Sequence, residues 1–365
     1  MKRFSSYTLV FMLSTVLLTG CIQTNIIDEL ALIYAVGYDQ AENNELEVTV
    51  TYPTFIEQGE ESALHQKTIS AVGKTTKGAT DLINAKTQKP LKKGQARVFL
   101  FSDKIAEGGI EHLVDSLYRD PSVPNRVHLA VTEGKAKDAF DAVEEGDDRV
   151  GVFIPDLIDQ IQQKSIPITN LHLFLFSMYN DGRDAFLPLL KADGELKVVG
   201  IALFDHDTYV DKLDLEESFV FRLLTTKGVG GSQQYRINHD DKEAYVVVEN
   251  ITSTYKNSLI KKGDNPTFDY HVKVRGEITD SSDRMNLDDP KLTAELEKQM
   301  EENLKETATV LVEKFKEKEI DPLGLGEKYR SRTRDWQPEK WKELYSNIEV
   351  KLTFDVEIVQ SGAIE

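Results

Sequence analysis

The pattern of hydrophobic and polar positions is clearest in the last hundred residues. Apolar side chains occupy the even positions of residues 268–274 and of residues 348–358, with mainly polar side chains between them. Each alternation predicts a strand with one buried face, and the second is typical of a long antiparallel strand. In between, apolar residues recur every three or four positions over residues 292–315, after Asp289 and Pro290, which is typical of a helix and its start. The order strand, long helix, strand predicts a compact α+β unit.

The first half of the chain mixes strand and helix patterns. Residues 46–52 alternate between apolar and polar side chains, and residues 97–102 form a short, mostly apolar run, so both segments are predicted strands. Asp103 is then expected to cap a helix whose apolar face extends from Ile105 to Tyr118. Strands that alternate with helices in this way predict a sheet covered by helices.

Two patterns leave alternatives open. The long helix over residues 292–315 could pack on its own sheet or form a coiled coil, and we expect the first because its stripe is short and lacks a steady heptad. The apolar run at residues 171–178 fits either a helix or a strand, since periodicity does not separate the two in so short a run.

Turn signals divide the chain into regions. The clearest signal in the middle of the chain is Asp193 followed by Gly194. We therefore expect two consecutive regions, residues 21–193 and residues 194–365, with sub-boundaries near residues 146 and 263. The predicted fold class is α+β, with a β-sheet and flanking helices in each domain.

The N-terminus has the pattern of a targeting segment. Two basic residues precede an apolar run at residues 7–18, and small residues follow it. This order predicts a secretory signal peptide over residues 1–20. The apolar run is too short for a comfortable membrane span, which needs about 20 residues.

Cys21 directly follows this segment and is the only cysteine of the chain. The triplet Leu-Thr-Gly before it is the lipobox pattern of bacterial lipoproteins. We expect the Cys21 sulfur to carry a diacylglyceryl thioether after cleavage of the chain before it, with acylation of the new amine. Two acyl chains would hold the protein stably on a membrane surface. The alternative is an ordinary signal peptide whose apolar run ends at a buried cysteine.

The charge balance restricts the partners. The chain has 62 acidic and 44 basic residues, a net charge of −18, and loss of Lys2 and Arg3 with the signal peptide makes it −20. Such a chain is not expected to bind nucleic acid by neutralising phosphates. Anionic lipid head groups should also repel it, so we expect the lipid on Cys21, and not a basic patch, to supply the attachment.

The sequence carries no recognised catalytic motif. It lacks a Gly-x-Ser-x-Gly elbow, a Gly-x-x-x-x-Gly-Lys-Ser/Thr phosphate loop and a His-Glu-x-x-His zinc motif. Cys21 is assigned to lipid, which leaves no nucleophilic thiol. The seven histidines show no metal-ligand spacing, and the glycine-rich residues 228–231 follow a predicted helix, which favours a loop over a phosphate site. No enzyme activity, metal or cofactor is therefore expected.

One segment after the long helix stands out. Residues 321–327 contain a proline and two glycines between apolar residues, which predicts a helix stop followed by a tight, partly buried loop. This segment and a nearby tryptophan form the candidate structural or interface motif. Its residues are Asp321, Pro322, Gly324, Gly326, Glu327 and Trp341.

Short motifs that carry a family resemblance are spread over the mature chain. They are Cys21 with residues 27–31 and 36–39, then Phe101 with residues 104–106, 109–110, 117–120, 135–136 and 199–204, and finally residues 321–327, Trp341, residues 348–358 and Gly362. With these motifs the sequence resembles the C-component lipoproteins of spore germinant receptors, the GerAC-type family of endospore-forming bacteria. The motifs at the C-terminal end are the most specific.

The resemblance implies a fold, a cellular location and protein partners. The implied fold is a set of consecutive α+β domains, and the implied role is non-enzymatic, on the outer face of the spore inner membrane. The implied partners are an A component and a multi-spanning B component, which together sense nutrients such as amino acids or sugars. Whether this chain itself binds a nutrient stays open. The alternative function is a solute-binding lipoprotein of an ABC-type importer, which requires two large, similar lobes around a cleft.

Overall fold

The computed structural model describes residues 29–58, 61–145, 149–228, 230–239, 242–334 and 336–359. The predicted signal peptide and Cys21 lie outside the described residues, and so do Gly362 and residues 146–148 at one predicted sub-boundary. Among the described helices, none combines the length and the apolar character that crossing a membrane requires.

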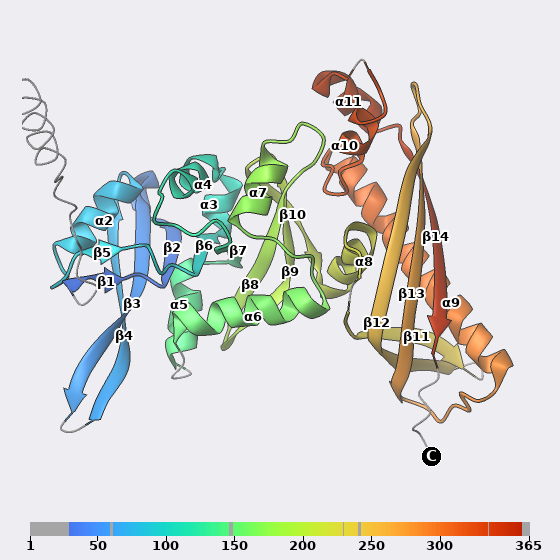
Figure 1. Ribbon diagram of the computed structural model, residues 1–365, viewed down its shortest axis with the longest axis horizontal. Helices are drawn as coiled ribbons and strands as arrows, with labels where there is room; N and C mark the ends of the chain where they lie inside the picture. The colour runs from blue at the N-terminus through green and yellow to red at the C-terminus, as the bar shows by residue number, and fades with distance from the viewer. Residues whose placement is uncertain are drawn as a thin grey trace, which may run out of the picture.

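The first unit is built on an eight-stranded mixed sheet (Figure 1). The four central strands run parallel to one another, and antiparallel hairpins complete both edges. The strand order is β10 (Thr208–Asp214), β9 (Glu195–Asp205), β8 (Phe186–Asp193), β7 (His128–Glu133), β6 (Val98–Ser102), β2 (Ala35–Gln40), β3 (Leu46–Gln58) and β4 (Glu61–Gly73). A small separate sheet pairs β1 (Ala31–Leu32) with β5 (Leu91–Lys92).

Both faces of the large sheet are covered because its central strands are apolar throughout. In β6, Val98 and Leu100 belong to the core on one face, and Phe99 and Phe101 to the core on the other. Of the described α-helices that precede β8, two cover the first face and four cover the second. They are α5 (Ala136–Glu145) and α6 (Val150–Lys164) on the first face, and α2 (Thr76–Asn84), α3 (Asp103–Glu107), α4 (Glu111–Tyr118) and α7 (Leu171–Met178) on the second.

The helix predicted after Asp103 is in fact two helices. The prediction of a single helix was wrong because Gly109 adopts a φ of +89°, which ends α3 and turns the chain before α4. The cap is also one residue earlier than expected, since the Ser102 hydroxyl accepts a hydrogen bond from the backbone N–H of Ile105 at 3.3 Å. The open alternative at residues 171–178 is decided in favour of a helix, α7, which the Asn170 side chain caps.

The second unit is a four-stranded sheet crossed by one long helix. The sheet order is β11 (Gln233–His239), β12 (Lys242–Lys261), β13 (Thr267–Ser281) and β14 (Glu349–Ile358). Helix α9 (Pro290–Glu317) begins after Asp289, as predicted, and buries its apolar stripe against this sheet, as expected for packing on its own sheet. The predicted unit of strand, long helix and strand is therefore present.

The direction of the last strand differs from the expectation. β14 pairs with β13 in parallel, over ten residue pairs from Thr267 with Glu349 to Gly276 with Ile358. Helix α9 has 28 residues and therefore spans about 42 Å, enough to carry the chain back along the sheet. Because the chain returns to the end at which β13 begins, β14 must run in the same direction as β13. The prediction of one buried face for β14 is correct.

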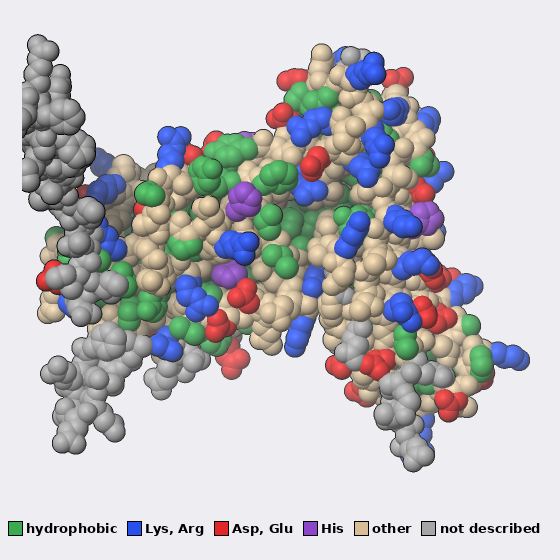
Figure 2. Space-filling model, viewed as in Figure 1, with side chains coloured by type: hydrophobic (Ala, Val, Ile, Leu, Met, Phe, Trp, Pro, Cys, Tyr) green, Lys and Arg blue, Asp and Glu red, His purple; other side chains and the backbone are tan. Residues whose placement is uncertain are grey.

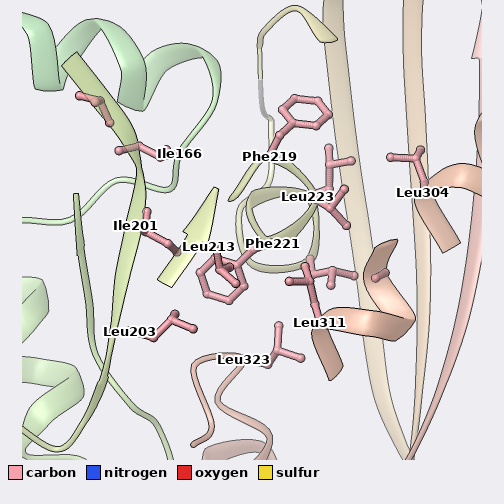
Figure 3. Close-up of a cluster of buried hydrophobic side chains, with 14 of the residues drawn as sticks. Ile166, Ile201, Leu203, Leu213, Phe219, Phe221, Leu223, Leu304, Leu311 and Leu323 are labelled. Atoms are coloured by element: carbon pink, nitrogen blue, oxygen red, sulfur yellow. The ribbon is translucent and has the colours of Figure 1, made fainter. Parts of the chain in front are cut away.

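The two units share a continuous core. Helix α8 (Leu215–Thr225) follows β10 and lies between the sheets, and Figure 3 shows its side chains Phe219, Phe221 and Leu223 between residues of both units. The Phe221 ring packs against Phe186 of β8, with ring centroids 5.3 Å apart, and against Phe315 of α9 at 5.9 Å. These contacts join the first sheet, through α8, to the long helix of the second unit.

The predicted regional boundaries fall within hairpins of the structure. Asp193 and Glu195 pair across the turn between β8 and β9, so the first sheet continues to Asp214, beyond the predicted division at residue 194. The predicted sub-boundary near residue 263 is the turn between β12 and β13 of one sheet. The division into residues 21–193 and 194–365 stays a prediction about sequence regions.

Candidate functional site

The candidate motif forms a tight turn at the end of α9. The chain leaves the helix at Lys318, and Glu319 adopts a φ of +55°. Asp321 is then buried, and its carboxylate accepts hydrogen bonds from the backbone N–H groups of Leu325 at 2.9 Å and Gly326 at 2.6 Å. These two donors belong to the first turn of α10 (Leu325–Arg330), whose N-cap residue is Gly324, so the Asp321 carboxylate satisfies two free N–H groups of that turn.

The same turn binds the first unit through the segment between α7 and β8. The backbone N–H of Asp184 donates to the Asp321 carbonyl at 3.0 Å, and the Asp321 N–H donates to the Asp184 carboxylate at 2.5 Å. The Glu327 N–H donates to the Gly182 carbonyl at 2.9 Å. The segment of residues 180–184 and the motif of residues 321–327 are therefore two sides of one joint, which we call the inter-unit joint.

Two glycines of the motif are required by close contacts at this joint. A Cβ atom on Gly326 would lie 2.5 Å from Nε1 of Trp341 and 2.9 Å from the Cα of Gly182, closer than such atoms pack. Gly324 has a φ of +68°, and a Cβ there would lie 2.5 Å from Nε of Arg183. The two glycines therefore allow the two segments to touch.

Trp341 completes the joint from α11 (Pro338–Tyr345). Its ring is buried among other aromatic rings, with centroid distances of 5.3 Å to Tyr329, 5.6 Å to Tyr345 and 6.0 Å to Trp336. The Phe268 ring, from β13, packs nearly perpendicular to the Trp341 ring, with ring centroids 6.2 Å apart. This aromatic cluster fixes α11 and the motif to the second sheet.

The structure thus brings most of the predicted motif together. Asp321, Pro322, Gly324, Gly326 and Trp341 are all buried around the joint, whereas the Glu327 side chain is only partly buried and lies 3.4 Å from Nε of Arg183. The sequence analysis missed the opposite side of the joint, residues 180–184. A signal for it exists in Asn180-Asp181-Gly182, a typical turn triplet, in which the Asn180 side chain accepts a hydrogen bond from the Gly182 N–H at 3.1 Å.

A cavity of about 280 Å³ opens beside the joint, between the two units. The first unit contributes the end of α7, the following segment and the turn between β9 and β10, and the second contributes α11. Its walls combine aromatic and charged side chains, among them Tyr179, Asp205, His206, Lys342 and Tyr345.

Burial dominates the electrostatics of the joint. It raises the pKa of Asp321 to about 7, and the nearby Asp184 carboxyl adds to this, although the two backbone hydrogen bonds act in the opposite direction. Burial also raises the pKa of Asp184. Because both carboxyl groups are engaged by backbone donors, their chemistry is that of helix capping and chain joining.

The contribution of Asp321 to protein stability is expected to fall as the pH rises from about 4 to about 7. The folded state holds the Asp321 proton up to about pH 7, whereas the unfolded chain releases it near 3.8, so the folded state binds more protons in this window. The loss is at most about 1.4 kcal/mol per pH unit for this one group. Urea unfolding of the wild type and of Asp321→Asn across this range measures it, and the variant should show a flatter profile.

The control for this prediction is Asp120→Asn. Hydrogen bonds from Ser122 hold the pKa of Asp120 below its usual value despite partial burial, so removing this carboxyl should leave the slope between pH 4 and 7 unchanged. Burial raises the pKa of Asp39 to about 6, so Asp39 contributes part of the fall in stability with pH in all three proteins. An equal slope in Asp321→Asn and wild type would contradict the assignment of the titration to Asp321.

The structure also brings together three residues that the sequence did not connect. Ligand-type atoms of Glu111, His206 and Asp207 lie within 4.8 Å of one another on the surface. The Asp207 carboxylate accepts the backbone N–H of Glu111 at 3.0 Å and so caps α4, which is a sufficient structural reason for its position.

Comparison with known proteins decides the family. A model described as "Spore germination protein N-terminal domain" matches residues 23–192, and one described as "Spore germination B3/GerAC like, C-terminal" matches residues 199–362. The chain belongs to the GerAC-type family of spore germination proteins. The resemblance drawn from the sequence motifs is therefore confirmed.

Individual spore germination proteins match this chain from end to end. Spore germination protein GerQC of Bacillus cereus is 32% identical over 367 residues, which cover 100% of both chains. Putative spore germination protein YfkR of Bacillus subtilis is 19% identical over 388 residues, covering 100% of this chain and 98% of that protein.

A solved structure carries the same GerAC-type fold. The crystal structure of the GerBC protein superposes with a TM-score of 0.57 at 16% sequence identity, over 89% of this chain and 97% of that one. This likeness confirms the predicted α+β fold class. The two units described here differ in strand number and topology, in contrast to the two similar lobes that the importer alternative requires.

Proposed function

We propose that this chain is a lipid-anchored, non-enzymatic subunit of a spore nutrient germinant receptor, acting with A and B membrane components to trigger germination. The observation that carries the proposal is the end-to-end similarity to a spore germination protein at 32% identity. The match of both family models over nearly the whole chain supports it.

The inter-unit joint supports a role as a scaffold. The Asp184 carboxylate accepts a hydrogen bond from the backbone of Asp321, 137 residues away, the buried Asp321 carboxylate accepts two from its own turn, and a shared hydrophobic core surrounds α8. Such a joint holds two dissimilar units in one fixed arrangement. A fixed arrangement suits a subunit that presents surfaces to partner proteins, and the proposal includes no catalytic step.

The proposed location of the protein is the outer face of the spore inner membrane. The lipobox triplet before Cys21 supports it, because two acyl chains anchor a protein stably where one chain is marginal. The lipid on Cys21 is the proposed membrane link, and the A and B components are the proposed protein partners.

Crosslinking from introduced cysteines tests the partnership. Because Cys21 is the only native cysteine, each new surface cysteine would be the only free thiol of a lipidated protein. Exposed positions such as Lys77, Lys197 and Glu306 sample different elements. With co-expressed A and B components, we expect the crosslinked positions to form one contiguous surface, and substitutions there to reduce the germinant response at unchanged protein level.

Titration calorimetry of the purified chain with amino acids and sugars separates the proposed function from the importer alternative. A solute-binding lipoprotein of an importer should bind one of these solutes tightly, whereas a receptor scaffold should show no tight binding. Tight binding by this chain alone, together with no crosslink to A or B from any position, would contradict the proposed function. The cavity beside the joint is the place where such a solute would be sought.

A further inference from the structure

Helix α7 is apolar on its outer side as well as on its buried side. Leu171, Phe174 and Met178 pack into the core of the first unit. On the outer side, Leu173, Phe176 and the following Tyr179 are between 38% and 56% exposed. A helix that is hydrophobic on all sides is usually covered on all sides, so the outer face is expected to have an occupant.

Neighbouring residues extend this outer face into a patch. Tyr118, at the end of α4, and Ile168, just before α7, are both 57% exposed. α4 packs against α7. Burial raises the pKa of Tyr179, and the nearby carboxylates of Asp115 and Glu111 on α4 raise it further, which places Tyr179 beside α4. Figure 2 shows hydrophobic side chains gathered over this part of the molecule. We call these residues the α4–α7 patch: Tyr118, Ile168, Leu173, Phe176 and Tyr179.

A basic segment lies next to the patch, across the cavity. Residues 328–342 contain six Lys and Arg residues and two acidic residues, in a chain whose net charge is −18. In the part of the chain that the structure describes, none of its bases Lys328, Arg330, Arg332, Arg334 and Lys340 forms an ion pair with a carboxylate. Tyr179 of the patch and Lys342 of the segment line the same cavity, so patch and segment border one another.

The expected anchor on Cys21 limits how far the bilayer can be from Glu29, the first described residue. Between Cys21 and Glu29, where the described chain begins, there are eight Cα–Cα steps, a reach of at most about 29 Å. Figure 1 shows α4, α7 and α11 along one long edge of the molecule, with β1, the first described strand, at one end. The anchored lipid is therefore held at that end of the molecule, within about 29 Å of Glu29.

We propose that this edge rests on the bilayer to which the chain is anchored, with the α4–α7 patch at the boundary of head groups and acyl chains and the basic segment on anionic head groups. The inference rests on the lipid anchor of the proposed function and adds the orientation of the protein on the membrane. Exposed aromatic and aliphatic side chains beside Lys and Arg are the composition of membrane-surface contacts.

The net negative charge of the chain does not oppose this contact. At physiological salt, charges are screened beyond about 8 Å, so head groups interact with the nearest residues and not with the whole protein. The repulsion expected from the sequence applies to the acidic surfaces, whereas the basic segment attracts anionic lipid locally. The proposed orientation therefore departs from the expectation that no basic patch contributes to attachment.

Lipid-borne quenchers test the orientation. The mature lipidated protein would carry a single fluorescent label at His172→Cys on α7, at Ser331→Cys in the basic segment, or at Lys298→Cys on α9, all exposed positions outside the patch and the charged set. It would be reconstituted into phosphatidylcholine vesicles with or without phosphatidylglycerol, containing doxyl-labelled lipid. We expect quenching at positions 172 and 331 to be several-fold stronger than at 298.

Matched variants separate the two contributions. The double variant Leu173→Gln, Phe176→Gln removes the apolar contact and should weaken quenching of the label at position 172. The triple variant Arg330→Gln, Arg332→Gln, Arg334→Gln removes the charges. In this variant, quenching of the label at position 331 should no longer depend on phosphatidylglycerol or on salt. The control for charge is Lys291→Gln with Lys298→Gln and Lys305→Gln, exposed lysines of α9, which should change neither result.

The outcomes distinguish this inference from the anchor itself. If the protein does not float with the vesicles, the anchor is wrong and this inference falls with it. If the protein floats but the three labels are quenched equally, the anchor stands and the orientation is wrong. Labels at 172 and 331 that stay unquenched in vesicles, and become covered only with A and B components present, would show a protein interface and overturn the proposal.

Discussion

Replacing Cys21 by alanine is expected to release the protein from the membrane and to abolish the germinant response, while the described units still fold. The physical reason is the loss of the acyl chains, each of which contributes about 0.8 kcal/mol per buried methylene to membrane binding. The cores of the described units are formed by residues from Ala31 onward, which the substitution does not alter, so we expect both units to fold in the variant. Membrane fractionation, mass spectrometry of the N-terminal peptide and release of dipicolinic acid from spores measure the three effects.

Gln23→Ala is the matched control for this change. It alters a residue two positions away and leaves the Leu-Thr-Gly-Cys motif intact, so lipid, membrane binding and response should all be retained. A Cys21→Ala protein that remained membrane-bound and responsive would contradict the anchor. An unmodified Cys21 thiol in protein from dormant spores would contradict it as well.

Gly326→Val is expected to destabilise the inter-unit joint by about 2–4 kcal/mol, because overpacking in a buried site forces side chains and backbone apart. The new Cβ would collide with the Trp341 ring and with the backbone of Gly182. Since Trp341 and Trp336 are the only tryptophans and both belong to the aromatic cluster, tryptophan fluorescence reports directly on this region during thermal unfolding.

Two controls identify the cause of the destabilisation. A Cβ atom on Gly94 would lie 3.9 Å from its nearest neighbour, the Ser122 carbonyl oxygen, so Gly94→Val should change the melting temperature little. Gly324 and Gly194 both have a positive φ, but only a Cβ on Gly324 would also collide with a neighbouring side chain. Gly324→Val should therefore destabilise the protein more than Gly194→Val. Unchanged melting of Gly326→Val with lost crosslinking to A or B would show that the motif is an interface to partners and not an internal joint.

The buried faces of the strands and of α9 could be predicted because apolar spacing is a local property of the sequence. The alternation over residues 348–358 shows which side chains of β14 are buried, but it is the same for parallel and antiparallel strands. The direction of β14 depends on where α9 returns the chain, which is why the expectation of an antiparallel strand was wrong. Gly109 split a predicted helix for a related reason, since an apolar stripe continues across a turn between two helices.

The candidate site was only half predictable. Proline and glycine marked residues 321–327 as a tight turn, because these residues have distinctive backbone preferences. The partner segment is 137 residues away in sequence at the contact of Asp321 with Asp184, and no local pattern shows which carboxylate meets which backbone donor. The contact between the two sides therefore became visible only in the tertiary structure.

By itself, the sequence determined the family, the α+β class and the buried side of the main strands and of the long helix, because these follow from residue identity and short-range spacing. Only the tertiary structure decided the direction of β14, the joint of residues 180–184 with residues 321–327, and the neighbourhood of the α4–α7 patch and the basic segment. Each of these depends on contacts between residues far apart in the chain, which are selected by packing of the whole molecule.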